Sequence, residues 1–160
     1  MYQRVMAIIE IISDYLADDF DLYEQEEEIV DDLVSMGFDF PEIETALSWI
    51  ANLSRGRDLN RQLLELNITG EFQRHFTQDE CRLLALPVRN WLMKLRQLEI
   101  LDQIMVEDII DQAMCLGAYR VGLDEIKIIA TMVVSIGQAD PEVRDRFLSY
   151  LENDRDMVFH

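Results

Sequence analysis

Apolar residues recur every three or four positions along most of the chain, which is the spacing of one face of an α-helix. These stripes predict helices over residues 2–16, 26–36, 40–54, 77–98, 105–116, 124–134 and 141–152. Only three prolines and six glycines occur among 160 residues, which favours long helices over a turn-rich β fold. We therefore predict an all-α protein of about seven helices, built around helix-turn-helix corners.

The helical pattern weakens between the two halves of the chain. Arg55-Gly56-Arg57 predicts the end of the third helix, after which Leu59, Leu63 and Leu66 allow one short helix. Residues 71–76 are compatible with one short extended segment. We predict two coupled lobes, divided as an acidic N-terminal lobe (1–54), a connecting segment (55–76), a C-terminal lobe (77–152) and a fraying tail (153–160).

The best-specified local feature is a corner between two helices around Gly37. A glycine there lets the backbone turn left-handed just after the helix C-cap. Phe38 then falls where a Schellman ending places an apolar contact back onto Leu33. Asp39 is expected to cap the next helix, and Glu42, three residues later, to reach back as in a capping box. Phe38 is thus predicted to hold both helices.

A second capping box is predicted at Thr77 and Glu80, opening the longest helix. Pro87 lies inside that helix and predicts a kink, because it removes one backbone hydrogen bond and clashes with the preceding turn.

On another face of the same predicted helix, Arg82, Arg89 and Arg96 recur every seven residues. That spacing drifts by only about 20° per step, so the three are expected to form one basic ridge. Two interpretations remain open. The ridge could pair with the protein's own acidic segment 24–32, or it could bind an acidic partner or a phosphate.

The net charge of −18 is unevenly distributed. Residues 1–50 hold fourteen acidic residues against Arg4 alone, whereas residues 51–100 hold eight basic and six acidic residues. The second helix of the corner carries Glu42 and Glu44 near its start and no Lys or Arg before residue 54, unlike a DNA-reading helix. We expect no tight binding to duplex nucleic acid and repulsion from anionic membranes.

The sequence lacks the usual patterns of enzymes and metal sites. The only histidines are His75 and His160, and no nucleophile set or phosphate-cradling glycine loop is present. The acidic pair Asp19 and Asp21 lacks the glycine of a calcium loop, and the acids of residues 24–32 lack Glu-x-x-His helices. We predict no enzymatic activity, no cofactor and no metal.

Three features point to the cytoplasm. Cys81 and Cys115 lie on apolar stripes outside any C-x-x-C pair, so both are predicted to be buried free thiols in a reducing compartment. The longest apolar run, residues 128–136, is about half of a membrane span. The first helix contains acidic residues and no cleavage site follows it, unlike a signal peptide.

Over nearly its full length the chain resembles the Smg family of bacterial proteins. The residues that carry this resemblance are Gly37-Phe38, Ile43, Ala46-Leu47, Trp49, Phe76-Thr77, Glu80-Cys81, Trp91-Leu92, Leu95, Leu98, Leu101 and Leu123-Asp124-Glu125-Ile126-Lys127. The resemblance implies a bacterial cytoplasmic protein of unknown function with no assigned catalytic residues, often encoded beside a DNA-processing protein.

Two classes of function stay open. The favoured one is a non-enzymatic protein-binding or regulatory module whose partner is a protein. The alternative is a nucleic-acid-associated protein that acts through the arginine ridge or through an acidic surface that imitates a phosphate backbone.

Overall fold

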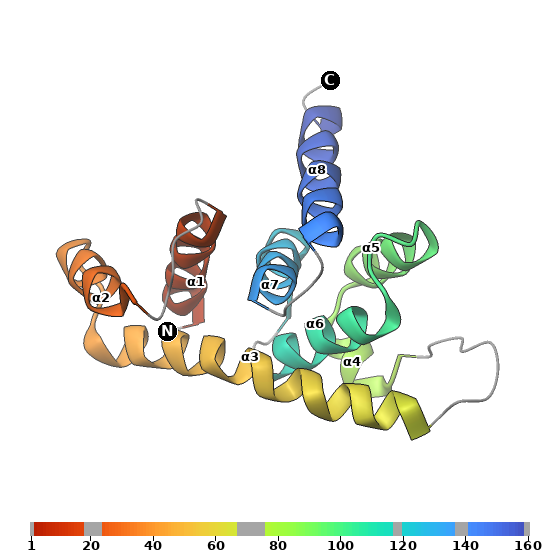
Figure 1. Ribbon diagram of the computed structural model, residues 1–160, viewed down its shortest axis with the longest axis horizontal. Helices are drawn as coiled ribbons and strands as arrows, with labels where there is room; N and C mark the ends of the chain where they lie inside the picture. Colours follow the sequence, from red (N-terminus) through yellow and green to blue (C-terminus); the bar gives the residue numbers. More distant parts are fainter. Residues whose placement is uncertain (1, 18–23, 67–75, 117–119, 137–140, 159–160) are drawn as a thin grey trace.

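The computed structural model describes residues 2–17, 24–66, 76–116, 120–136 and 141–158, and in these segments it contains eight helices (Figure 1). They are α1 (Tyr2–Ala17), α2 (Glu26–Ser35), α3 (Phe40–Leu66), α4 (Gln78–Leu83), α5 (Leu86–Gln97), α6 (Gln103–Cys115), α7 (Leu123–Ile136) and α8 (Pro141–Val158). Within the described segments, the β-type pairing is limited to an isolated parallel bridge between Leu84 and Val121. The protein is all-α, as predicted.

The long helix α3 organises the packing. In Figure 1 it runs along one side of the molecule, with α1 and α2 over its first half and α4 and α6 over its second half. Helices α1, α6 and α7 all pack against α3, and α7 also packs against both α1 and α6. The apolar stripe of each helix faces this assembly, so its branched side chains are removed from water.

The buried side chains form one cluster that spans both predicted lobes. Fully buried members are Ile8 of α1, Ile50 of α3, Leu95 of α5, Ile129 of α7 and Phe147 of α8. The two lobes are therefore coupled through a shared core, whereas the exact domain boundaries stay a prediction.

The predicted end of the third helix is wrong. Helix α3 passes through Arg55-Gly56-Arg57 and continues to Leu66, into the segment predicted as a connection. One glycine inside a helix costs only about 1 kcal/mol relative to alanine, and the leucines beyond it keep the helical spacing. Helix α8 likewise continues to Val158, into the predicted tail. The predicted extended segment falls outside the described residues, except for Phe76.

The predicted kink at Pro87 is instead a complete break between α4 and α5. Leu84 is extended (φ −97°, ψ 112°) and ends α4, while Pro87 stands in the first turn of α5. Proline cannot donate to the carbonyl four residues earlier, which is that of Leu83. The Leu83 carbonyl accepts a hydrogen bond from the Val121 N–H at 2.8 Å instead. A backbone donor from elsewhere in the chain thus satisfies the carbonyl that the break leaves without its helical partner.

The capping box predicted at the start of α4 is confirmed. The Thr77 hydroxyl accepts from the Glu80 N–H at 3.2 Å, and the Glu80 carboxylate accepts from the Thr77 N–H at 2.9 Å. This reciprocal pair satisfies two backbone donors that the helix itself cannot.

Candidate functional site

The α2–α3 corner has the backbone predicted for it. Gly37 has φ +96°, and the Gly37 N–H donates to the Val34 carbonyl at 3.0 Å. The Phe38 N–H donates to the Leu33 carbonyl at 3.2 Å. These two bonds define a Schellman motif, with Phe38 half-buried against the core.

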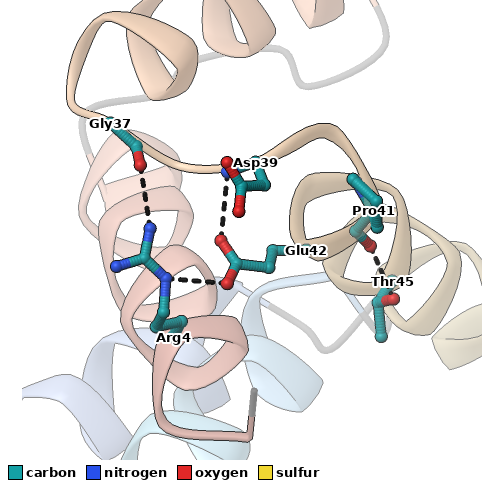
Figure 2. Close-up of polar contacts among 6 residues, drawn as sticks. All are labelled: Arg4, Gly37, Asp39, Pro41, Glu42 and Thr45. Carbon is teal, nitrogen blue, oxygen red and sulfur yellow. Dashed lines mark hydrogen bonds and ion pairs between the residues drawn. The ribbon is translucent and has the colours of Figure 1, made fainter.

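Arg4 of α1 holds this corner in place, as Figure 2 shows. Its Nε donates to Glu42 Oε1 at 2.7 Å and its Nη2 donates to the Gly37 carbonyl at 2.8 Å. The guanidinium also lies 5.2 Å from the centroid of the Phe38 ring, a cation–π geometry. One side chain therefore ties α1 to the end of α2 and to the start of α3.

Glu42 forms the other half of this network. Its Oε2 accepts from the Asp39 N–H at 3.0 Å, which is the reach-back bond of the predicted capping box. The reciprocal bond is not found: among the described residues, no hydrogen bond reaches the Asp39 carboxylate. The Asp39 N–H, followed by the Arg4 guanidinium, lowers the pKa of the Glu42 carboxyl below its usual range. Glu42 is only 9% exposed and stays ionised at neutral pH.

Sequence reasoning missed the role of Arg4. The available signal was its isolation, since it is the single basic residue among the first fifty and faces fourteen acids. Which carboxylate it would select depends on how α1 docks on α3, and this is a tertiary property.

The three arginines predicted to form one ridge do not share a helix. Arg82 is an exposed residue of α4, while Arg89 and Arg96 lie on α5 and are half-buried. The seven-residue argument requires a continuous helix, and the break at Leu84 removes it. Figure 1 also places α2 and α5 on opposite sides of the molecule, so the ridge cannot neutralise the acidic segment 24–32 as a unit. Contact of any of these arginines with a partner stays a prediction.

Arg89 has a clear structural role at the α4–α5 junction. Its Nε donates to the Leu84 carbonyl at 3.1 Å and its Nη1 to Cys81 Sγ at 3.3 Å. The guanidinium lies 6.0 Å from the Phe76 ring centroid. Arg89 thus satisfies a carbonyl that the helix break leaves without a helical partner.

Both cysteines are free, but the prediction that they are buried is wrong. Cys81 is half-buried beside Arg89, and Cys115 is exposed at the last residue of α6. Their apolar stripes end at the junction and at the helix terminus, where the neighbouring helices no longer cover them.

The surface around the corner combines acid with exposed apolar groups. Val34, Met36 and Phe40 are 47%, 55% and 68% exposed, respectively. All the acidic residues of α2 are also exposed, namely Glu26, Glu27, Glu28, Asp31 and Asp32. A hollow of about 560 Å³ opens on this acidic side, lined by Val30 and by acids of residues 24–31. The corner therefore presents a negatively charged surface together with exposed apolar side chains.

In the described segments, no helix is both long and apolar enough to cross a bilayer. No group of three or more His, Cys, Asp or Glu side chains in the same segments is arranged to hold a metal ion.

Comparison with known proteins gives a consistent picture. Residues 6–160 match the family model described as "Protein of unknown function (DUF494)". A Protein Smg homolog of Pseudoalteromonas translucida (strain TAC 125) is 28% identical over 134 residues, covering 84% of this chain and 83% of the relative. Protein Smg of Sodalis glossinidius (strain morsitans) is 27% identical with the same coverage, and Protein Smg of Yersinia pestis (strain Pestoides F) is 25% identical over 127 residues, covering 79% and 81%. No solved structure matches. With a family model that spans the chain from residue 6 to its end and relatives similar over most of their length, this chain belongs to the Smg family of bacterial proteins, a family of unknown function.

Proposed function

We propose that this protein is a non-enzymatic binding module of the bacterial cytoplasm, whose α2–α3 corner contacts a partner protein. The observation that carries the proposal is the exposure of Val34 at the end of α2, Met36 in the corner and Phe40 at the start of α3. Exposed apolar side chains close together in the chain and bordered by charge are typical of interaction surfaces.

The charge of the surrounding surface indicates the chemistry of the partner. Helix α2 presents five exposed acids, and the whole chain carries −18. Complementary potentials speed association and exclude partners of like charge. The partner segment is therefore basic, with one or two apolar side chains that cover Met36 and Phe40.

The clamp supports the same proposal. Arg4 fixes the turn from a neighbouring helix, so the exposed apolar groups are held before any partner arrives. A preorganised surface loses less conformational entropy on binding than a loose loop does.

Affinity purification with matched variants tests this proposal. Met36→Glu together with Phe40→Glu is expected to lose a bacterial protein that the parent retains, at an unchanged melting temperature. The control is Leu86→Glu at the start of α5 with Leu98→Glu just after its end, and these side chains are 57% and 51% exposed. It adds the same charge elsewhere and should retain that protein. Loss in both variants, or in neither, would contradict a corner-specific interface.

The nucleic-acid alternative is less favoured, because the three arginines lie on two helices and not along one continuous helix. We expect no tight binding of duplex DNA at physiological salt, since a surface of this charge repels phosphates. Submicromolar affinity that weakens with salt in a gel-shift titration would reverse this order of preference.

A further inference from the structure

A second surface with exposed apolar side chains lies on helix α5. Leu86 at its start and Leu98 just after its end are 57% and 51% exposed, and Asn90 and Lys94 between them are exposed as well. These four residues, here called the α5 face, follow one another at intervals of four and lie within about a third of the helix circumference. The corner and the α5 face together hold five of the six exposed large apolar side chains in the described part of the chain.

The two surfaces carry opposite charge. Residues 24–44, which include the corner, contain nine acidic and no basic residues. Residues 82–98, which include the α5 face, contain four basic and no acidic residues. The α5 face therefore has the chemistry that the corner requires of its partner, namely positive charge together with one or two apolar side chains.

The two surfaces do not meet within one molecule. Figure 1 places α2 and α5 on opposite sides, with α1, α6 and α7 between them. A contact between the corner and the α5 face therefore joins two molecules. Each molecule in such a contact still offers one free surface to the next, which is the property of a heterologous interface.

Charge also selects among the contacts that two copies can make. Pairing of two corners would bring acid against acid, and pairing of two α5 faces would bring base against base. Like charges across an interface are unfavourable, so the contact between unlike surfaces is preferred. The net charge of −18 opposes every contact between copies, but the Debye length is about 8 Å at physiological ionic strength. The charges close to the contact therefore dominate.

We propose that the corner of one molecule docks on the α5 face of a second copy, so that the protein associates head to tail. With two or three exposed apolar side chains on each side, the contact is weak and depends on protein concentration. This inference rests on the proposed function, because both use the corner. Association covers Met36 and Phe40, and it therefore competes with any other protein that binds there.

Sedimentation velocity of the purified full chain tests this contact. We expect the parent to form dimers and then larger species as its concentration rises to submillimolar, because each end keeps a free surface. Met36→Glu with Phe40→Glu blocks the corner, and Leu86→Glu with Leu98→Glu blocks the α5 face. Each variant alone should stay monomeric. An equimolar mixture of the two should form a dimer and nothing larger, because each supplies the surface that the other has lost.

The mixture also shows that both variants are folded, since a misfolded chain does not restore association. Three results would overturn the proposal: a parent that stays monomeric at submillimolar concentration, a mixture that stays monomeric, or an α5 variant that associates as the parent does. The last of these results would point to contacts between two corners.

A matched pair of single variants tests the role of local charge. Lys94→Glu reverses a charge within the α5 face and should weaken association about tenfold. Arg146→Glu makes the same change in net charge at an exposed position of α8 and should weaken association less than about twofold. Equal weakening by the two variants would show that net charge, and not the α5 face, controls association.

Failure of this inference can be told apart from failure of the proposed function. Sedimentation uses the purified chain alone, whereas the proposed function is tested by capture of a different protein. Corner-specific capture without self-association would contradict only the head-to-tail contact. Self-association without such capture would leave the corner as a contact between copies and contradict the proposed function.

Discussion

An arginine side chain stabilises both the α2–α3 corner and the α4–α5 junction. At each, an arginine donates to a backbone carbonyl, that of Gly37 or that of Leu84. At each, the guanidinium also lies over a phenylalanine ring, at 5.2 Å in the corner and 6.0 Å at the junction. Exposed or broken helix ends leave carbonyls without partners, and arginine can satisfy them while packing its own plane.

The origin of the arginine is where the two regions differ. Arg89 belongs to the junction it closes, and its other acceptor is the nearby Cys81 thiol. Arg4 comes from α1, far away in the sequence, and its other acceptor is the Glu42 carboxylate. The arginine of the junction is therefore supplied locally, whereas the arginine of the corner is supplied by the docking of a third helix. The predictions below compare single residues in and near these regions.

The largest effect is expected at Phe38. It is half-buried, packs against the core and lies under Arg4, so Phe38→Ala should cost about 2–3 kcal/mol, somewhat less than truncating a fully buried aromatic residue. Phe40, two residues later, is 68% exposed. Phe40→Ala should change stability by less than about 0.5 kcal/mol. Urea titrations of both variants make the comparison, and equal losses would contradict the clamped corner.

Arg89 comes second. Arg89→Leu leaves the Leu84 carbonyl without its guanidinium donor and should cost about 1–2 kcal/mol. The exposed Arg82, one of the other two arginines of the predicted ridge, provides the control, because Arg82→Leu should stay within about 0.5 kcal/mol. Thermal unfolding of the two variants should separate them. Equally small losses of stability in the two variants would show that Arg89 does not stabilise the junction.

Gly37 and Glu99 form the next pair, because α2 and α5 end in the same motif. Glu99, just after α5, has φ +58°, and the Ile100 N–H donates to the Leu95 carbonyl at 3.0 Å. Gly37→Ala should cost about 1 kcal/mol through the left-handed backbone alone, since no atom of the described residues beyond the two chain neighbours lies within 4 Å of the added methyl group. Glu99→Gly should instead stabilise by up to about 1 kcal/mol. Changes of the same sign would rule out this explanation.

The two capping boxes should give different results. Thr77→Ala removes a complete box and should cost about 1 kcal/mol. Asp39→Ala should cost much less, because in that box the Asp39 N–H donates to the Glu42 carboxylate, and alanine retains this N–H. Chemical denaturation can compare the two directly. A loss at Asp39 as large as that at Thr77 would show that its carboxylate caps α3 after all.

Local sequence signals predicted what depends on neighbouring residues. The left-handed turn at Gly37 and the box between Thr77 and Glu80 need only positions three to five residues apart. The stripes of α1, α6 and α7 followed in the same way from helical spacing. Each of these features depends on residues that are close together in the sequence.

Features that depend on distant partners could not be predicted. Pro87 can break the helix because the Val121 N–H donates a hydrogen bond to the Leu83 carbonyl. No residue near Pro87 in the sequence indicates this bond. The ridge prediction failed for this reason. The clamp of Arg4 likewise requires the packing of α1 against the corner, which no spacing along one helix encodes.

The smallest effect, and the one most specific to the corner, is its response to acid. The pKa of Glu42 is lowered in the folded protein, so the unfolded chain binds this proton more readily. The stabilisation from Glu42 is therefore fully present above about pH 4.5, its ordinary value, and is lost as the pH falls through the lower folded value. Glu42→Gln should be less stable than the parent at neutral pH, and the two should converge in acid. Arg4→Met should lose less stability between pH 7 and pH 3 than the parent does. It should still lose some, because the Asp39 N–H remains the larger cause of the lowered pKa of Glu42. Urea titrations from pH 7 to pH 3 measure all three proteins, and parallel curves for the parent and Glu42→Gln would show that this carboxylate does not link α1 to the corner.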